Sequence, residues 1–165
     1  MSRQDGADTV DEPNSFVRPV GYVDPDPVTR RIGFRDCFLG NVHAADPARY
    51  DGEPEVEFEF VLSATQDPQP ATTHHHPLED GPGNEWSQFE AAVDTARELL
   101  GSDGPALIHC KAGISRSTTL LATAIAAEEG RSFREALSMV QAARPLAVPH
   151  PALHELAVCY LAALE

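Results

Sequence analysis

The fold of this chain is decided by the stretch Ala106-Leu107-Ile108-His109-Cys110-Lys111-Ala112-Gly113-Ile114-Ser115-Arg116-Ser117. It predicts a short apolar strand, a tight loop that carries a cysteine, and a helix that continues through the apolar run from Leu120 to Ala127. Backbone N–H groups of a compact loop between a strand and a helix can converge on one anion, and the helix N-terminus adds its positive dipole end. The stretch therefore predicts a phosphate-binding loop.

Side chains of this loop supply chemistry as well as binding. The field of the loop favours a thiolate over a thiol, so Cys110 is expected to have a depressed pKa and to act as a nucleophile. Arg116 follows after five intervening residues and can grip two phosphate oxygens with its planar guanidinium. Gly113 lets the backbone turn. Ser117 can donate a hydrogen bond to the sulfur, which helps it to leave in a second step.

These residues carry a resemblance to a known family. The pair His109-Cys110, five residues, and then Arg116-Ser117 resembles the signature of the cysteine-dependent protein phosphatases, and its spelling is similar to that of the dual-specificity branch. The segment Phe38-Leu39-Gly40-Asn41 resembles that family's early "LYLGN" strand, and Arg144-Pro145-x3-Pro149 resembles its "RPxxxP" turn. The resemblance covers roughly residues 30–165. The alternative is a buried cysteine at the end of a strand, followed by an ordinary helix.

The length and the cysteine content set further bounds. The chain has 165 residues, which suits one domain with a substantial core. It contains no apolar run of the roughly 18 residues that span a bilayer, and its polar N-terminus lacks a signal-peptide core, so we expect a cytoplasmic protein. Three cysteines predict a reducing compartment. Cys159 is expected in the core; Cys37 is expected in a strand, with oxidative pairing to Cys110 as the less favoured alternative.

The charge is strongly one-sided. The formal net charge is −14, and Lys111 is the only lysine in the chain. This balance resembles that of halophilic proteins, which work where the Debye length falls to about 3 Å at 1 M salt. It argues against nucleic acid and anionic membranes as partners, since both would be repelled. We expect a monomer that acts on a phosphorylated protein or peptide.

Two regions are predicted along the chain. Residues 1–28 are expected to form a flexible acidic leader that touches the domain through Phe16, Val17 and Tyr22, and residues 29–165 the catalytic domain. Expected strands lie near 30–34, 37–40, 56–62, 72–78 and 106–108, with a short helix near 42–50. Expected helices cover 85–100, 115–129, 132–144 and 151 to the end, two of them opening with the capping boxes Ser87-x-x-Glu90 and Ser132-x-x-Glu135. The prediction is a three-layer α/β fold with a mostly parallel central sheet of about five strands flanked by helices.

A phosphatase of this kind needs a general acid, because the leaving alkoxide or phenolate must take up a proton. The loop Pro77-Leu78-Glu79-Asp80-Gly81-Pro82-Gly83 offers two carboxyl groups between a strand and a helix. The resemblance places the family's acid in this region, and its "PxxD" pattern falls on Asp80. Glu79 is the local competitor.

Histidines raise the question of a metal. His74, His75 and His76 alternate faces on an extended segment, so they cannot all bind one ion, and we expect them on a strand rim with no metal site. His109 is expected to be structural, with its ring hydrogen-bonded to backbone carbonyls so that it holds the cysteine loop. No cofactor is expected.

The predicted function is that of a phosphomonoesterase that works through a cysteinyl-phosphate intermediate. Cys110 attacks, the backbone of residues 111–116 (Lys111, Ala112, Gly113, Ile114, Ser115 and Arg116) and the Arg116 side chain bind the phosphoryl oxygens, and Asp80 acts as acid and then as base. The resemblance implies activity on phosphotyrosine and on phosphoserine or phosphothreonine. Two alternatives stay open at this point: a phosphoinositide or small phosphoester phosphatase, favoured by Lys111, and a phosphoresidue-binding module without turnover.

Overall fold

The computed structural model describes residues 22–165, which form one α/β domain built on a five-stranded sheet. The sheet has the spatial order β1-β2-β5-β3-β4. Its strands are β1 (Thr29–Arg31), β2 (Cys37–Gly40), β3 (Phe60–Ser63), β4 (His74–His75) and β5 (Ala106–His109). The central strand β5 is parallel to both of its neighbours, and only β1 runs antiparallel. The carboxyl ends of β2, β5 and β3 therefore meet at one edge, where open α/β sheets place their ligands.

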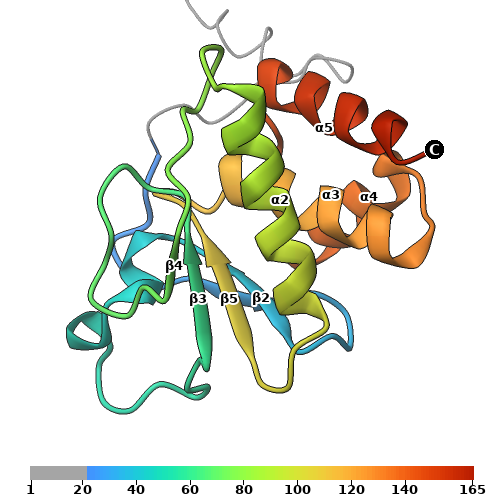
Figure 1. Ribbon diagram of the computed structural model, residues 1–165. Helices are drawn as coiled ribbons and strands as arrows, with labels where there is room; N and C mark the ends of the chain where they lie inside the picture. Colours follow the sequence, from blue (N-terminus) through green and yellow to red (C-terminus); the bar gives the residue numbers. More distant parts are fainter. Residues whose placement is uncertain (1–21) are drawn as a thin grey trace, which may run out of the picture.

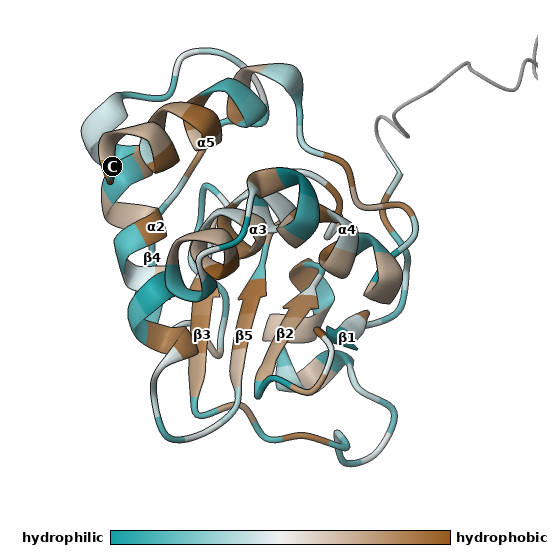
Figure 2. Cartoon of the chain, turned by 90° about the vertical axis from the view of Figure 1, so that its right-hand side faces the viewer, coloured by the Kyte–Doolittle hydropathy of each residue, from teal (hydrophilic) through white to brown (hydrophobic). Residues whose placement is uncertain are grey.

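Four α-helices cover one face of this sheet (Figures 1 and 2). They are α2 (Trp86–Leu100), α3 (Arg116–Glu129), α4 (Phe133–Ala143) and α5 (Pro151–Ala163). The central helix is α3, in which every side chain from Ser117 to Ala126 is buried. Its small residues, among them Ala124 and Ala126, leave room for α2, α4 and α5 to pack against it.

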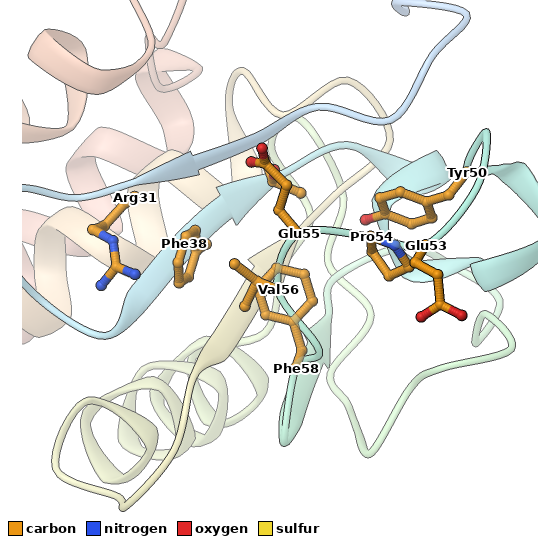
Figure 3. Close-up of a pocket in the computed structure, with 9 residues that line it drawn as sticks. Arg31, Phe38, Tyr50, Glu53, Pro54, Glu55, Val56 and Phe58 are labelled. Atoms are coloured by element: carbon orange, nitrogen blue, oxygen red, sulfur yellow. The ribbon is translucent and has the colours of Figure 1, made fainter.

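The other face of the sheet is covered without an α-helix among the described residues. Phe38, Val61 and Leu107 form a small second core on this face, beneath the 3-10 helices η1 (Val42–Ala45) and η2 (Pro47–Arg49) and the segment 50–58. A hollow of about 460 Å³ lies at its edge, with Arg31 and Phe38 on one wall and the segment 53–58 on the other (Figure 3). The predicted fold class is confirmed, with this third layer made of short turns and extended chain.

Several predicted elements are shorter than the sequence suggested. The strand expected at 56–62 begins only at Phe60, because Phe60 pairs with Ala106, where β5 itself begins, and residues 56–59 run past the start of that strand. The helix expected at 42–50 is interrupted at Asp46, which caps the second 3-10 helix. Phe34 lies fully exposed in the turn after β1 instead of in the strand.

One of the two predicted capping boxes is present. Ser132 accepts from the Glu135 N–H, and the Glu135 carboxylate accepts from the Ser132 N–H, as predicted. The box expected at Ser87 is wrong: α2 begins at Trp86 with Glu85 as its N-cap, and no side chain caps it. Asn84, one turn earlier, does not cap the helix either, because its amide is hydrogen-bonded to Glu79 in the preceding loop.

The end of the predicted leader that the structure describes is tied to the domain. Asn41, completely buried, accepts from the Val28 N–H (3.0 Å) and donates to the carbonyl oxygens of Asp26 (2.9 Å) and Asp24 (3.4 Å). Tyr22 is exposed and donates to the Asp24 carboxylate. The contacts expected for Phe16 and Val17 lie outside the described residues, and the boundary at residue 28 stays a prediction.

The cysteine expectations need one correction. Cys159 is exposed and not in the core, because α5 turns Leu153, Ala157 and Tyr160 inward at helical spacing and leaves Cys159 on the next face. Cys37 is buried in β2 opposite Ala106, so Cys110 lies four residues further along the neighbouring strand, about 13 Å away. A disulfide needs Cα atoms within about 7 Å, so these two cysteines cannot pair without movement of a strand.

Within residues 22–165, none of the helices combines the length and the hydrophobicity that a membrane span requires.

The folded domain is braced at one corner by an ion pair between two residues that are far apart in the sequence. Both carboxylate oxygens of Glu129, at the end of α3, accept from the Arg35 guanidinium at 2.6 Å. These hydrogen bonds lower the pKa of Glu129 from about 4.5 to about 2, with Arg131 assisting.

This pair predicts a pH-dependent stability. Because the folded pKa of Glu129 is depressed, its stabilisation is complete above pH 4.5 and is lost as the pH falls towards 2. We expect Glu129→Gln to lower the free energy of unfolding by about 1 kcal/mol at pH 7 and by progressively less below pH 4.5. Urea unfolding at a series of pH values measures this, with the exposed Glu155→Gln as the control. An equal deficit at pH 7 and pH 3 would contradict the assignment.

Candidate active site

The loop after β5 curls around the sulfur of Cys110, as predicted from the sequence. The Cys110 side chain is only 2% exposed, and its Sγ lies 3.1 Å from Ser117 Oγ. The backbone N–H groups of Ile114 and Ser117 also donate to this sulfur. The sulfur therefore sits at the floor of a cup whose wall is made of N–H groups.

The surroundings of Cys110 favour the thiolate. Burial on its own would raise the pKa of this thiol, but the positive charge of Arg116 and the hydrogen bonds from Ser117 and Ile114 outweigh it. The pKa of Cys110 is lowered as a result. Cys37 shows the opposite case, since burial raises the pKa of its thiol to about 12 and leaves it unreactive.

The carbonyl groups of the loop are held on its outer side. Arg144, only 5% exposed, donates from Nη2 to the Ala112 oxygen (3.1 Å) and from Nε to the Gly113 oxygen (3.2 Å). These are charge-assisted bonds made by a planar donor with fixed geometry, so they set the direction of two successive peptide groups.

Backbone groups hold the carbonyls on either side of that pair. The Lys111 oxygen accepts from the Val42 N–H at 3.0 Å, and the Ile114 oxygen accepts from the Val148 N–H at 2.8 Å. Four consecutive carbonyls, from residue 111 to residue 114, are thus bonded outward. An anion inside the loop meets N–H groups and no carbonyl oxygen, which is the arrangement that binds phosphate.

Gly113 permits the sharpest part of the turn. Its φ is +70°, in the left-handed region, and a Cβ at this position would lie 2.9 Å from the Gly40 carbonyl oxygen. The loop is therefore packed directly against the end of β2, where only a glycine fits.

Arg116 opens α3 and reaches across the mouth of the cup. Its Nη1 donates to the carbonyl oxygens of Leu78 (3.1 Å) and Ala64 (3.4 Å), on the segments that follow β4 and β3. A guanidinium has five donors, so this leaves the edge formed by Nε and Nη2 to grip two oxygens of one phosphoryl group. Lys111 is the other basic residue of the loop. Its side chain is exposed, and only its backbone carbonyl contributes to the shape of the loop.

His109 supports the loop from beneath. Its Nδ1 lies 3.2 Å from the Cys110 carbonyl oxygen, and its Nε2 lies 2.6 Å from Ser63 Oγ. A carbonyl oxygen only accepts, so Nδ1 carries the proton and Nε2 accepts from the serine. Burial lowers the pKa of His109 to about 4, which keeps the ring neutral. This matches the structural role expected for it, with Ser63 as an additional partner.

The segment expected to carry the general acid lies beside the cup. The carbonyl oxygen of Leu78 accepts a hydrogen bond from Arg116. Leu78 precedes Asp80 by two residues, so the Cα atoms of Leu78 and Asp80 lie within about 7.6 Å of each other. The side chains of Glu79 and Asp80 are both exposed. The geometry thus brings the loop of the two candidate acids to Arg116, the arginine expected to bind phosphate.

The three successive histidines take separate partners. His74 is hydrogen-bonded to Thr73 Oγ1, His75 to the Thr65 carbonyl and His76 to Thr95 Oγ1, each at 2.8 Å. The segment forms the edge of the sheet, as expected. Among residues 22–165, no three His, Cys, Asp or Glu side chains gather as a metal ion would require.

Two supporting residues have roles that the sequence did not reveal. Arg144 was recognised only as part of a turn motif, yet it holds the loop carbonyls. His150 caps α5 with Nδ1, and its backbone N–H donates to Ser115 Oγ at 2.8 Å. The contacts of Arg144 with the loop and of His150 with Ser115 cross more than 30 residues, so no local pattern could have shown them. The one available signal was the arginine directly before Pro145, at the end of an amphipathic helix.

A cysteine sulfur with a lowered pKa in a cup of N–H groups, with an arginine at its mouth, is the arrangement expected of a cysteine-dependent phosphatase. The comparisons with known proteins agree. The sequence model of the dual specificity phosphatase catalytic domain matches residues 38–159. The chain belongs to this family, which confirms the predicted family and the predicted class of enzyme.

Individual relatives share about 30% of the aligned residues with this chain. Mouse dual specificity protein phosphatase 15 is 30% identical over 124 residues, which cover 72% of this chain and 52% of that protein. Mouse receptor-type tyrosine-protein phosphatase F is 29% identical over 132 residues, but these cover only 7% of its length and 73% of this chain. The chain thus spans about half of the first of these curated relatives and a small part of the second.

Solved structures share the fold. The crystal structure of human DUSP28 superimposes with a TM-score of 0.70 at 24% identity and covers 84% of this chain and 98% of that one. The crystal structure of DUSP15 gives a TM-score of 0.61 at 26% identity, with 78% and 84% covered.

The glycine in the loop offers a matched test of the cup. Gly113 and Gly130 have almost the same φ, +70° and +66°, but a Cβ on Gly130 would meet nothing within 4 Å. We expect Gly130→Ala to cost only the left-handed strain of about 1 kcal/mol, with vanadate affinity unchanged. Gly113→Ala adds the clash with Gly40 and should weaken vanadate binding at least about tenfold. Equal effects of the two variants in calorimetric titration would show that the close approach does not shape the cup.

Proposed function

We propose that this protein hydrolyses phosphomonoesters on proteins or peptides, by phosphoryl transfer to Cys110 and then to water. The observation that carries the proposal is the Cys110 sulfur, with a lowered pKa, at the floor of a loop whose carbonyls all point away from it. Such a site binds a phosphate dianion and presents a nucleophile to its phosphorus atom at once.

In the first step, the Cys110 thiolate attacks phosphorus and the bond from phosphorus to the ester oxygen breaks. The loop N–H groups and the free edge of Arg116 hold the three equatorial oxygens, where negative charge is spread in the transition state. Asp80 gives its proton to the departing oxygen, so that an alcohol or phenol leaves instead of its anion.

In the second step, the Asp80 carboxylate takes a proton from a water molecule that attacks the phosphorus atom of the cysteinyl phosphate. The sulfur–phosphorus bond breaks, and inorganic phosphate and the thiolate are released. Ser117 Oγ, 3.1 Å from the sulfur, donates to the thiolate as it leaves. The enzyme returns to its starting protonation state.

Phosphotyrosine, phosphoserine and phosphothreonine are the proposed substrates, and family membership is what supports them. We further propose a cytoplasmic monomer that binds neither nucleic acid nor anionic membranes, because a net charge of −14 repels both. The same acidity supports a halophilic setting. Turnover of a phosphopeptide panel at low and at multimolar salt tests the substrate class and the halophilic setting, and phosphoinositide turnover in preference to phosphopeptides would favour the alternative substrate class.

The nucleophile can be tested directly. We expect Cys110→Ser to lower p-nitrophenyl phosphate turnover at least about 10⁴-fold while phosphate binding is retained, because the loop N–H groups remain in place. Cys37→Ser is the control, since that thiol is remote and unreactive. Turnover that survives in Cys110→Ser would reject the mechanism, and phosphopeptide binding without any turnover by the unmodified protein would favour a binding module.

The choice between the two acids is testable through the leaving group. Asp80→Ala should slow phenyl phosphate hydrolysis by about 10² or more, because phenoxide leaves poorly without a proton. It should affect p-nitrophenyl phosphate much less, since nitrophenoxide is a stable anion. Glu79→Ala is the matched control on the neighbouring residue. If Glu79→Ala shows the leaving-group dependence and Asp80→Ala does not, the acid is Glu79.

A further inference from the structure

We propose that Asn84 is a positioning residue for Asp80. The side-chain amide of Asn84 holds the acid loop, residues 77–83, in its working position before any substrate binds. This inference rests on the proposed role of Asp80 as general acid. It concerns how the loop is held: the glycines around the acid suggest a loop that moves, whereas the hydrogen bonds describe one that is fixed.

The amide of Asn84 braces the backbone on both sides of Asp80. Its Oδ1 accepts from the Glu79 N–H at 2.8 Å, and its Nδ2 donates to the carbonyl oxygens of Glu79 (3.0 Å) and Gly81 (3.2 Å). One side chain thus satisfies three backbone groups within three residues. Only an amide has an acceptor and two donors in this arrangement; a carboxylate has no donor for the two carbonyls.

The loop held by Asn84 is also bonded to the phosphate site at its start and lies beside it further along. At its start, the Leu78 carbonyl accepts from Arg116 Nη1 (3.1 Å) and from Gln66 Nε2 (2.9 Å). Further along, Gly81 is buried, and a Cβ built there would lie 3.8 Å from Nε2 of His150. His150 in turn donates its backbone N–H to Ser115 in the phosphate loop. Asp80 therefore lies between a residue bonded to Arg116 and a buried glycine beside His150.

The sequence of the loop explains why a brace is needed. Gly81 and Gly83 flank Pro82, and Gly83 has a φ of +106° with nothing within 4 Å of a Cβ position. Glycine loses more conformational freedom on ordering than any other residue, so this segment would sample many shapes without the Asn84 amide. A general acid must stay within hydrogen-bond reach of the leaving oxygen, and a displacement of about 1 Å can cost about 10²-fold in rate.

The test uses the leaving group and a double-mutant cycle. We expect Asn84→Ala to lower kcat for phenyl phosphate by about tenfold and for p-nitrophenyl phosphate by less than about twofold. Asn84→Asp should be at least as damaging, because its carboxylate would face two carbonyl oxygens. In the Asp80→Ala background, Asn84→Ala should cause no further loss, since the residue that it positions is already gone. Ser87→Ala, exposed on the first turn of α2, is the control.

Two structural readouts separate positioning from a general loss of fold. The vanadate affinity and the unfolding midpoint of Asn84→Ala should match those of the unmodified protein. Amide exchange of Glu79 should become faster, because its N–H donates to Asn84, while exchange in residues 110–117 stays unchanged. If Asn84→Ala fails to fold, Asn84→Asp, which keeps the shape and the acceptor, carries the same comparison.

The outcomes distinguish this inference from the proposed function. A loss that persists in the Asp80→Ala background, or one equal for both leaving groups, would overturn the positioning role and leave Asp80 as the acid. A fall in vanadate affinity that accounts for the lost turnover would overturn it in the same way. If Asp80→Ala itself has no effect on phenyl phosphate, the assignment of the acid fails, and the role of Asn84 fails with it.

Discussion

The site depends on the outward direction of four consecutive backbone carbonyls, those of residues 111–114. A peptide group has its N–H and its C=O on opposite sides, so a carbonyl bonded outward turns the N–H of the next residue inward. Arg144 fixes two of these carbonyls, and the N–H groups of Val42 and Val148 fix the other two. The converging N–H groups favour the thiolate of Cys110 and, in the proposed mechanism, also hold the phosphoryl group, so one constraint serves nucleophile and substrate together.

This constraint explains why parts of the chain far apart in sequence are needed for one small loop. The groups that hold the loop belong to Val42, shortly after β2, and to Arg144 and Val148, in the connection between α4 and α5. The buried helix α3 fixes the loop's far end, and its small side chains let α4 and α5 pack closely enough to place Arg144 and His150. The packing of the helices is therefore part of the catalytic apparatus.

The acid loop follows a different logic. Leu78 and Gly81 are buried, but the two acidic residues between them are exposed and followed by glycines, so polar side chains hold this part of the loop. Arg116 bonds the loop to the site through the Leu78 carbonyl, and the Asn84 amide bonds the backbone of Glu79 within the loop. The arginine proposed to grip the phosphoryl oxygens is therefore also the arginine that anchors the loop with the proposed acid. In the proposed mechanism, one guanidinium joins binding to proton transfer.

The sequence by itself determined the order of strands and helices, the strand–loop–helix around Cys110 and the family, because these depend on local spacing and on residue types that phosphate chemistry demands. It could not determine the partners of Arg144 or His150, since hydrogen bonds across more than 30 residues leave no periodic trace. Nor could it place Cys159, which an apolar helix suggested was buried; which face of α5 lies inward is decided by its packing against the rest of the domain. Only tertiary structure decides such pairings, because they follow from which surfaces meet.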